Sequence, residues 1–214
     1  MKLHTPILLL LLIFLSHSSN SNSPFIPESL NLTSTNYYSV YIMDNGKSNM
    51  EDLQYMLLFY NPNINESFAE EIARVYVEES IDEGINHDIA FCQMILETGF
   101  LNYGGSVGKS QNNFCGLGAT SSSSRGESFP DVRTGIRAHI QHLKAYASHD
   151  DISKESVDRR FRFVKRGSAK TIYALKGRWA MDPHYDKKLE NLLERLFALR
   201  QLNASDENLS STHY

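Results

Sequence analysis

Glu97 and Gln93 are the most chemically suggestive polar residues in this sequence, because they lie one helical turn apart in a stretch that is otherwise apolar. The spacing predicts a short helix over residues 86–99, with Asn86 as its N-cap and Gly99 at its C-terminal end. A carboxylate at the C-terminal end of a buried helix meets negative partial charge and apolar neighbours, and both raise its pKa. Such a group stays protonated near neutral pH and can act as a proton donor. The alternative is that Glu97 extends into solvent at a frayed helix end.

The elements that must position this helix are mostly other helices. Between them, residues 103–126 combine glycines with a serine run and keep no helical period, which predicts loops and a small hairpin. We therefore expect an α+β, mostly helical fold with a small irregular or β lobe inserted after the helix of Glu97, a layout typical of a glycan-cleaving cleft. Apolar periodicity predicts the other helices over residues 50–60, 67–83, 134–148, 168–175 and 183–202.

The N-terminus has the pattern of a secretory signal peptide. Lys2 and His4 precede an apolar run over residues 6–15 that is too short to span a bilayer, and polar residues 16–23 follow. We expect cleavage near residue 22 and export to the periplasm, the cell envelope or the medium, without stable membrane insertion afterwards. An uncleaved anchor is the alternative.

The remaining chain divides into three parts. Residues 23–65 form a leader with one short helix, residues 66–202 the main domain, and residues 203–214 a polar tail that we expect to be disordered. The 214 residues carry a formal net charge of −4, which argues against a nucleic-acid-binding protein. We expect a monomer.

The histidines and cysteines do not predict a metal site or a nucleophile. His139 and His142 are three apart on a helix, but no carboxylate or cysteine completes a ligand set, so we expect packed or solvated histidines and no metal. Cys92 and Cys115 either form a disulfide or remain two buried thiols, and the sequence favours neither.

A series of short motifs also occurs in a fixed order over residues 67–200. In that order the chain resembles the N-acetylglucosaminidase family of bacterial peptidoglycan hydrolases, the glycoside hydrolase family 73 group with a mannosyl-glycoprotein endo-beta-N-acetylglucosaminidase-like domain, which includes the flagellar rod-assembly hydrolase and many autolysins. The matching stretches are Glu83-Gly84-Ile85, Asp88-Ile89-Ala90-Phe91, Leu96-Glu97-Thr98-Gly99-Phe100, Asn112-Asn113-Phe114, Gly116-Leu117-Gly118-Ala119, Phe129-Pro130-Asp131-Val132-Arg133-Thr134-Gly135 and Ala180-Met181-Asp182-Pro183-His184-Tyr185.

The resemblance implies a lysozyme-like fold and an exported enzyme that cleaves the β-1,4 bond after N-acetylglucosamine in peptidoglycan by general acid catalysis, with no cofactor. It assigns the catalytic acid to Glu97 and implies that Tyr185 helps to hold the acetamido group of the sugar. A core aromatic is the alternative for Tyr185. Other functions in view are a muramidase or lytic transglycosylase of the same fold and a non-catalytic wall-binding or assembly module.

The resemblance also suggests residues that contact the glycan strand. It indicates Asn113 and Phe114 as cleft-lining residues, and we expect Gln93 and Asp131 to contact the substrate as well. Glu127 is the first candidate for a second catalytic carboxylate and Asp131 the next. The alternatives are a loop cap for Asn113, a solvated charge for Glu127 and a helix cap for Asp131, and the substrate's own acetamido oxygen in place of a second carboxylate.

Overall fold

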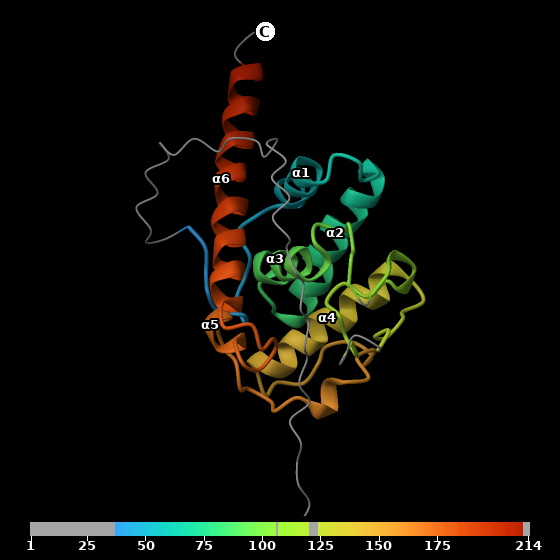
Figure 1. Cartoon of the computed structure of the whole chain (residues 1–214). Coiled ribbons are helices and arrows are strands. Elements are labelled where there is room, and N and C mark those ends of the chain that lie inside the picture. The colour runs from blue at the N-terminus through green and yellow to red at the C-terminus, as the bar shows by residue number, and fades with distance from the viewer. Residues whose placement is uncertain (1–36, 106, 120–123, 212–214) are drawn as a thin grey trace, which may run out of the picture.

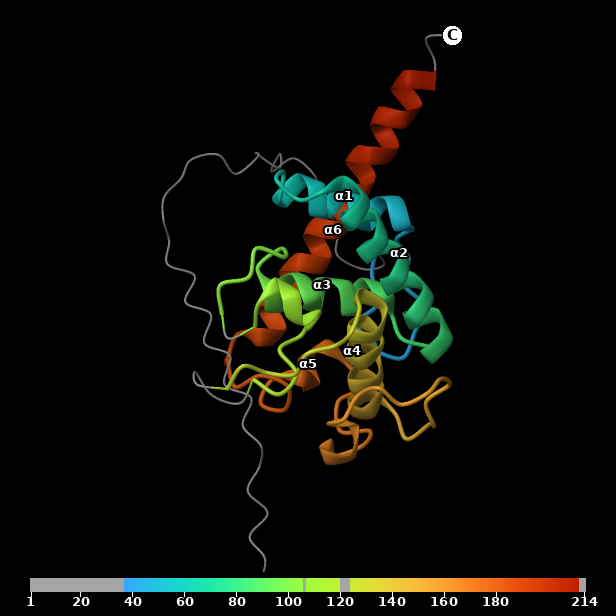
Figure 2. The same ribbon diagram turned by 90° about the vertical axis from the view of Figure 1, so that its right-hand side faces the viewer.

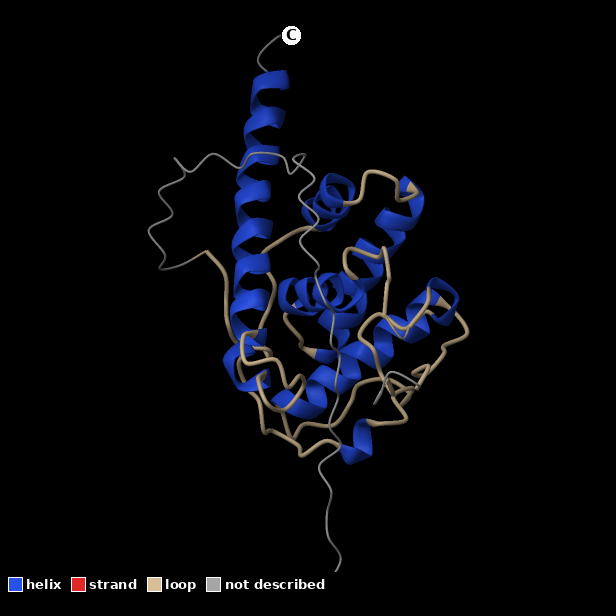
Figure 3. Ribbon diagram, in the orientation of Figure 1, coloured by secondary structure: helices blue, strands red, loops and turns tan. Residues whose placement is uncertain are grey.

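The computed structural model describes residues 37–105, 107–119 and 124–211. Helices make up its frame, and no strand occurs among these residues (Figure 3), where β-pairing is limited to isolated bridges such as Tyr41 with Thr171 and Met43 with Ile85. The α-helices are α1 (Met50–Tyr60), α2 (Glu66–Glu83), α3 (His87–Thr98), α4 (Val132–Ala147), α5 (Ile172–Leu175) and α6 (Tyr185–Ser211), with short 3-10 helices η1 (Lys109–Gln111) and η2 (Phe161–Phe163).

Helix α3 lies in the middle of the molecule, with α6, α2 and α4 packed around it (Figures 1 and 2). Ten of its residues are buried, which follows from a sequence that is apolar on nearly every side. The helix begins and ends as predicted: the Asn86 side chain accepts hydrogen bonds from the backbone N–H groups of Asp88 and Ile89, and Gly99 adopts a left-handed conformation at φ 58°.

The helices predicted from periodicity are present, with shifted ends. Helix α4 begins at Val132 because the Asp131 side chain caps it, accepting from the Thr134 N–H at 2.7 Å. Helix α5 covers only the second half of the predicted stretch. Helix α6 continues past the predicted end at residue 202 to Ser211, because the chain has no glycine or proline there to end it.

The expected hairpin after α3 is replaced by irregular backbone in the part of this segment that the structure describes. Side-chain amides take the place of a strand ladder. Gln111 Nε2 donates to the Arg125 carbonyl at 2.6 Å, Asn112 Nδ2 to that of Phe129 at 3.1 Å, and Asn113 Nδ2 to that of Glu127 at 2.9 Å. The outgoing and returning chains are therefore held together without β-structure.

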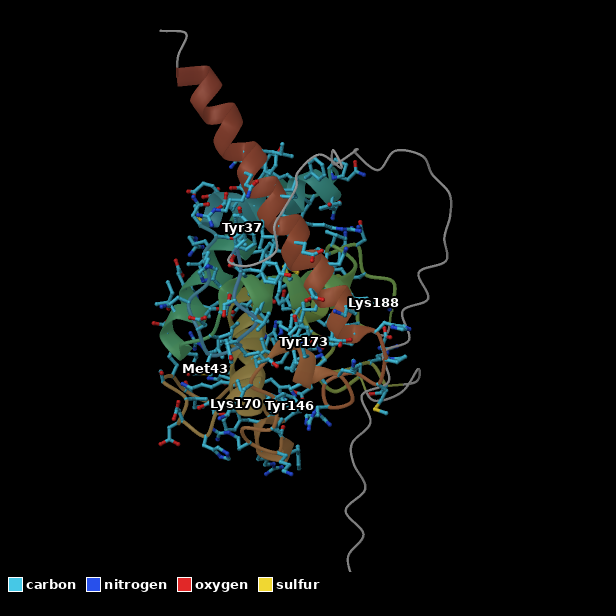
Figure 4. The ribbon with its side chains drawn as sticks, turned by 90° about the vertical axis from the view of Figure 1, so that its left-hand side faces the viewer. Tyr37, Met43, Tyr146, Lys170, Tyr173 and Lys188 are labelled. Atoms are coloured by element: carbon cyan, nitrogen blue, oxygen red, sulfur yellow. The ribbon has the colours of Figure 1, made fainter. Side chains whose placement is uncertain are left out.

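Part of the predicted leader packs on the main domain. The Ile42 N–H donates to the Lys170 carbonyl at 3.0 Å, and the Ile42 carbonyl accepts from the Asn86 N–H at 2.9 Å. Asp88, in the first turn of α3, accepts from the Lys47 N–H at 2.7 Å. Figure 4 labels Met43 and Lys170 on this side of the molecule. The signal peptide predicted for residues 1–22 lies outside the described residues, and no helix within them is long and apolar enough to cross a membrane.

Candidate active site

Glu97 lies in the last turn of the central helix α3 and lines a pocket at the junction with the irregular segment. The remaining lining residues come mainly from the loop that follows α3, and the pocket as a whole is lined by Glu97, Thr98, Tyr103, Gly104, Gly105, Val107, Asn113 and Gly116. Burial raises the pKa of Glu97 to about 7, against hydrogen bonds from Tyr185 and Trp179 that lower it. The carboxyl group is thus protonated over much of the neutral range, as a general acid must be.

The two oxygens of Glu97 have different surroundings. Oε1 accepts two hydrogen bonds, from the Tyr185 hydroxyl at 2.8 Å and from the Trp179 indole N–H at 3.1 Å. Oε2 has no hydrogen-bond partner among the described residues. It is also absent from the buried side-chain atoms that lack a partner, so it is accessible to solvent. Oε2 is therefore the oxygen open to the pocket, and the acidic proton belongs on it because Oε1 already accepts twice.

Tyr185 is the first residue of α6, and its ring is buried. Its hydroxyl accepts a hydrogen bond from Gln93 Nε2 at 2.7 Å and gives its single proton to Glu97. Burial, the largest cause, and the nearby Glu97 raise the pKa of this phenol well above its ordinary value, so it remains a donor. The structure thus brings Tyr185 to Glu97, whereas contact with the acetamido group stays a prediction.

Trp179 was missed by the sequence analysis. Its ring contacts those of His139, His142 and Tyr146, with centroid distances of 5.7, 5.2 and 5.7 Å. This packing aims the indole N–H at Glu97, and His142 is itself held by Asp158 through a 2.7 Å contact. The only available signal was that the single tryptophan of the chain directly precedes the Ala180–Tyr185 motif.

The other predicted substrate contacts are dispersed. Asn113 lines the pocket, and it also fills the loop-capping alternative, since its Oδ1 accepts from the Leu117 N–H at 3.0 Å. Phe114, predicted to line the cleft, is instead 1 % exposed in the core. Gln93 is fully buried beneath the site, and Asp131 serves as the cap of α4, so neither lines the pocket.

Glu127 lies behind the pocket wall rather than in it. Its carbonyl accepts from Asn113, its N–H donates to the Leu117 carbonyl at 2.7 Å, and its side chain lies against Gly118. Its Oε2 is buried without a hydrogen-bond partner among the described residues. The structure therefore places Glu127 near the pocket but not on its lining.

The backbone between Glu97 and the pocket loop takes an unusual path. Phe100, Leu101 and Tyr103 all have positive φ, at 57°, 60° and 54°, a region that costs free energy for residues with side chains. Hydrogen bonds to Thr98 hold this turn: the Tyr103 N–H donates to its carbonyl at 2.9 Å and the Leu101 N–H to its Oγ1 at 3.0 Å. The tight path places Tyr103 in the pocket wall, beside the carboxyl group.

The remaining candidates behave as structural groups. His139 and His142 are buried, and no cluster suited to a metal ion occurs among the described residues. Cys92 and Cys115 are free and buried, so the structure selects the two-thiol alternative over the disulfide. Burial raises the pKa of both thiols well above the ordinary value, which makes them unreactive.

Comparison with known proteins gives two matches of different kinds. The family model described as mannosyl-glycoprotein endo-beta-N-acetylglucosaminidase matches residues 73–197, a range that includes Glu97, Trp179 and Tyr185. An uncharacterized protein of Borreliella burgdorferi (strain ATCC 35210 / DSM 4680 / CIP 102532 / B31) is 45% identical over 193 residues, which cover 90% of this chain and 94% of the relative. No solved structure matches.

Proposed function

The chain belongs to the mannosyl-glycoprotein endo-beta-N-acetylglucosaminidase family and is a glycoside hydrolase, and from this premise we propose that it is an exported peptidoglycan hydrolase that cleaves the β-1,4 bond after N-acetylglucosamine. The observation that carries the proposal is the geometry of the Glu97 carboxyl group in the pocket, with Oε1 bound by two donors and Oε2 open. We further propose that the helical frame has the lysozyme-like arrangement expected for such an enzyme.

In the proposed reaction, Glu97 is the general acid. The Oε2–H group donates its proton to the glycosidic oxygen as the bond from that oxygen to the anomeric carbon of N-acetylglucosamine breaks. The electron pair of that bond leaves with the oxygen, and positive charge develops on the sugar. Glu97 becomes a carboxylate, whose charge the Tyr185 hydroxyl and the Trp179 indole stabilise through Oε1.

A second group must stabilise the positive sugar or activate water. We propose Glu127 or the acetamido oxygen of the substrate, and the two possibilities predict different mutant behaviour. If Glu127 acts on the sugar, Glu127→Gln slows hydrolysis about as severely as Glu97→Gln; if the acetamido oxygen acts, Glu127→Gln retains most of the activity. In the second case an N-acetyl group on the cleaved sugar is indispensable.

The proposed function is tested by digesting purified sacculi with the wild type and with Glu97→Gln. The wild type should release fragments with N-acetylglucosamine at their reducing ends, and the variant should be slower by at least roughly 10²-fold, the usual loss when a general acid is removed. Muramic acid or anhydro-muramic acid ends would instead identify a muramidase or a lytic transglycosylase. Lysis at nearly the wild-type rate by Glu97→Gln would exclude Glu97 as the acid, and inactivity of the folded wild type would indicate a wall-binding module.

A further inference from the structure

Four buried hydrogen bonds connect the core of the molecule to Glu97. They join side chains from four helices: Tyr76 on α2, His139 on α4, Gln93 on α3 and Tyr185 on α6. The successive distances are 2.9 Å from Tyr76 Oη to His139 Nδ1, 3.0 Å from His139 Nε2 to Gln93 Oε1, 2.7 Å from Gln93 Nε2 to Tyr185 Oη and 2.8 Å from Tyr185 Oη to Glu97 Oε1. The first three side chains are fully buried and Tyr185 is 3 % exposed, so water does not compete for these bonds.

Tyr76, at the end of this hydrogen-bond series farthest from Glu97, determines which nitrogen of His139 carries the imidazole proton. Burial lowers the pKa of His139 to about 3, so the ring is neutral and has one N–H group. Among the described residues, His139 Nδ1 is the hydrogen-bond partner of the Tyr76 hydroxyl. A fully buried hydroxyl must donate its proton to avoid an unsatisfied group, so Nδ1 accepts and the imidazole proton is on Nε2.

The orientation of the Gln93 amide follows from that tautomer. His139 Nε2–H donates to Gln93 Oε1, which leaves the amide N–H of Gln93 to face Tyr185. The Tyr185 oxygen therefore accepts from Gln93, and its one proton is left for Glu97. With the amide reversed, Gln93 Oε1 would attract the phenol proton and Glu97 would lose one of its two donors.

We propose that Tyr76, His139 and Gln93 are positioning residues that commit the Tyr185 proton to Oε1 of Glu97 and so keep Oε2 as the oxygen that meets the substrate. The significance for catalysis rests on the proposed function, in which Glu97 is the general acid. The direction of the hydrogen bonds does not depend on it and can be measured without substrate.

Trp179 provides that measurement, because it is the single tryptophan of the chain and its indole N–H donates to Glu97 Oε1. Its fluorescence should therefore change as Glu97 loses its proton. Other titratable groups face this pair: His139, His142 and Tyr146 around the indole, Tyr185 and Cys115 beside Glu97, and Asp158 and Glu127 farther out. The part of the fluorescence titration that disappears in Glu97→Gln belongs to Glu97.

The decisive variant is His139→Phe, which keeps an aromatic ring in the core and removes the donor to Gln93. Without that donor the Gln93 amide can reverse, the Tyr185 hydroxyl then donates to Gln93 Oε1, and Glu97 loses a hydrogen-bond donor. The fluorescence midpoint assigned to Glu97 should therefore rise by about one pH unit, because a carboxylate with fewer donors binds its proton more tightly. His139→Gln, whose amide N–H can replace Nε2–H, should restore much of the wild-type midpoint. Tyr173→Phe removes a hydroxyl that donates to Glu190, outside this series of hydrogen bonds, and should leave the midpoint unchanged.

A merely structural role for this series of hydrogen bonds predicts a different result. It would lower the melting temperature of His139→Phe but leave the Glu97 midpoint at the wild-type value, and that outcome, or a lower midpoint, would overturn the proposal. If His139→Phe does not fold, Tyr76→Phe decides the question, since it removes only a hydroxyl and frees the imidazole to take either tautomer. Its midpoint should also rise, by a smaller amount, and an unchanged midpoint would likewise overturn the proposal. Failure of the proposed function would appear separately, as full activity of Glu97→Gln on sacculi.

Discussion

At the scale of single residues, the proposed role of Glu97 as the general acid predicts that its pKa limits the pH range in which the enzyme works. Because burial raises this pKa to about 7, the acid form is the major species below that pH and disappears above it. We expect kcat on purified sacculi to fall about tenfold per pH unit once the pH exceeds about 7 by one unit. A rate that stays level up to pH 9 would contradict this assignment of the acid.

The same pKa has a consequence for stability with a defined sign. The folded-state pKa of Glu97, about 7, lies above its ordinary value of 4.5, so the folded protein binds the proton more tightly than the unfolded chain. The associated stability is fully present below pH 4.5 and is lost as the pH rises through about 7. Glu97→Gln should therefore melt at a higher temperature than the wild type at pH 8.5, with a clearly smaller difference at pH 4. Equal differences at both pH values would contradict the shift.

The residues of the site differ in how far the sequence could predict them. Glu97 was recognisable because a carboxylate is out of place at the end of an apolar helix, and the resemblance added Tyr185. Trp179 and His139 gave no comparable signal, because their hydrogen bonds join positions 82 and 46 residues apart in the chain. Phe114 was misplaced because an aromatic residue in a glycine-rich segment fits a cleft and a core equally well.

At the scale of elements, the pocket wall depends on a close backbone contact. A Cβ atom on Gly135 of α4 would lie 1.8 Å from the Asn112 carbonyl oxygen, so the pocket loop rests directly on the helix. Gly135→Ala must push this loop away, and we expect a loss of about 1–3 kcal/mol in the free energy of unfolding, with weaker hydrolysis. Urea unfolding measures the loss. Gly104→Ala is the control, since nothing lies within 4 Å of a Cβ there, and equal stability of the two variants would contradict the contact.

Elements with a strong internal period were predictable, and those held by side chains were not. The apolar stripes of α2 and α4 and the caps of α3 are local patterns, so their positions could be read from the sequence. The loop after α3 is shaped by amides from residues 111–113 that reach the chain 14 to 17 residues later, and no local pattern indicates such bonds. The end of α6 could not be placed from the sequence, because residues 203–211 are polar and contain no glycine or proline that marks a helix end.

At the scale of the whole molecule, helices α2 and α4 are joined by a buried carboxylate. Glu79 has no exposed side-chain surface and accepts from Arg133 at 2.7 Å and from Arg137 at 2.8 Å. Burial by itself would raise the pKa of Glu79, but the hydrogen bonds from Arg137 and Arg133 outweigh it and the pKa is lowered. This contribution to stability is present above the ordinary value of 4.5 and is lost as the pH falls through the lowered pKa.

Substitutions at two neighbouring positions test this connection between α2 and α4. Glu79→Gln removes a buried charge from two arginines and should cost at least about 2 kcal/mol at pH 7. Glu78→Gln should cost under about 1 kcal/mol, because that carboxylate is 42 % exposed and solvent screens it. Urea unfolding at pH 7 and pH 3 measures both, and the difference between Glu79→Gln and the wild type should shrink at pH 3. Equal losses in the free energy of unfolding for the two variants at pH 7 would contradict a stabilising role for the Glu79 ion pairs.

The mostly helical character of the fold was predictable from the spacing of apolar residues. The arrangement of the helices around α3 was not, because it depends on long-range contacts such as those of α1 and α3 with α6, which have no signature within either helix. The lysozyme-like arrangement stays a prediction based on the resemblance.

Helix α6 begins with Tyr185, whereas Glu97 lies in the last turn of α3, 88 positions earlier. During synthesis the carboxyl group therefore emerges long before the phenol that steadies it. A nascent chain that stops short of the last helix has the Glu97 carboxyl group without that donor. The hydrogen bond that holds Oε1 of Glu97 can therefore form only after α6 has been synthesised and has packed against α3.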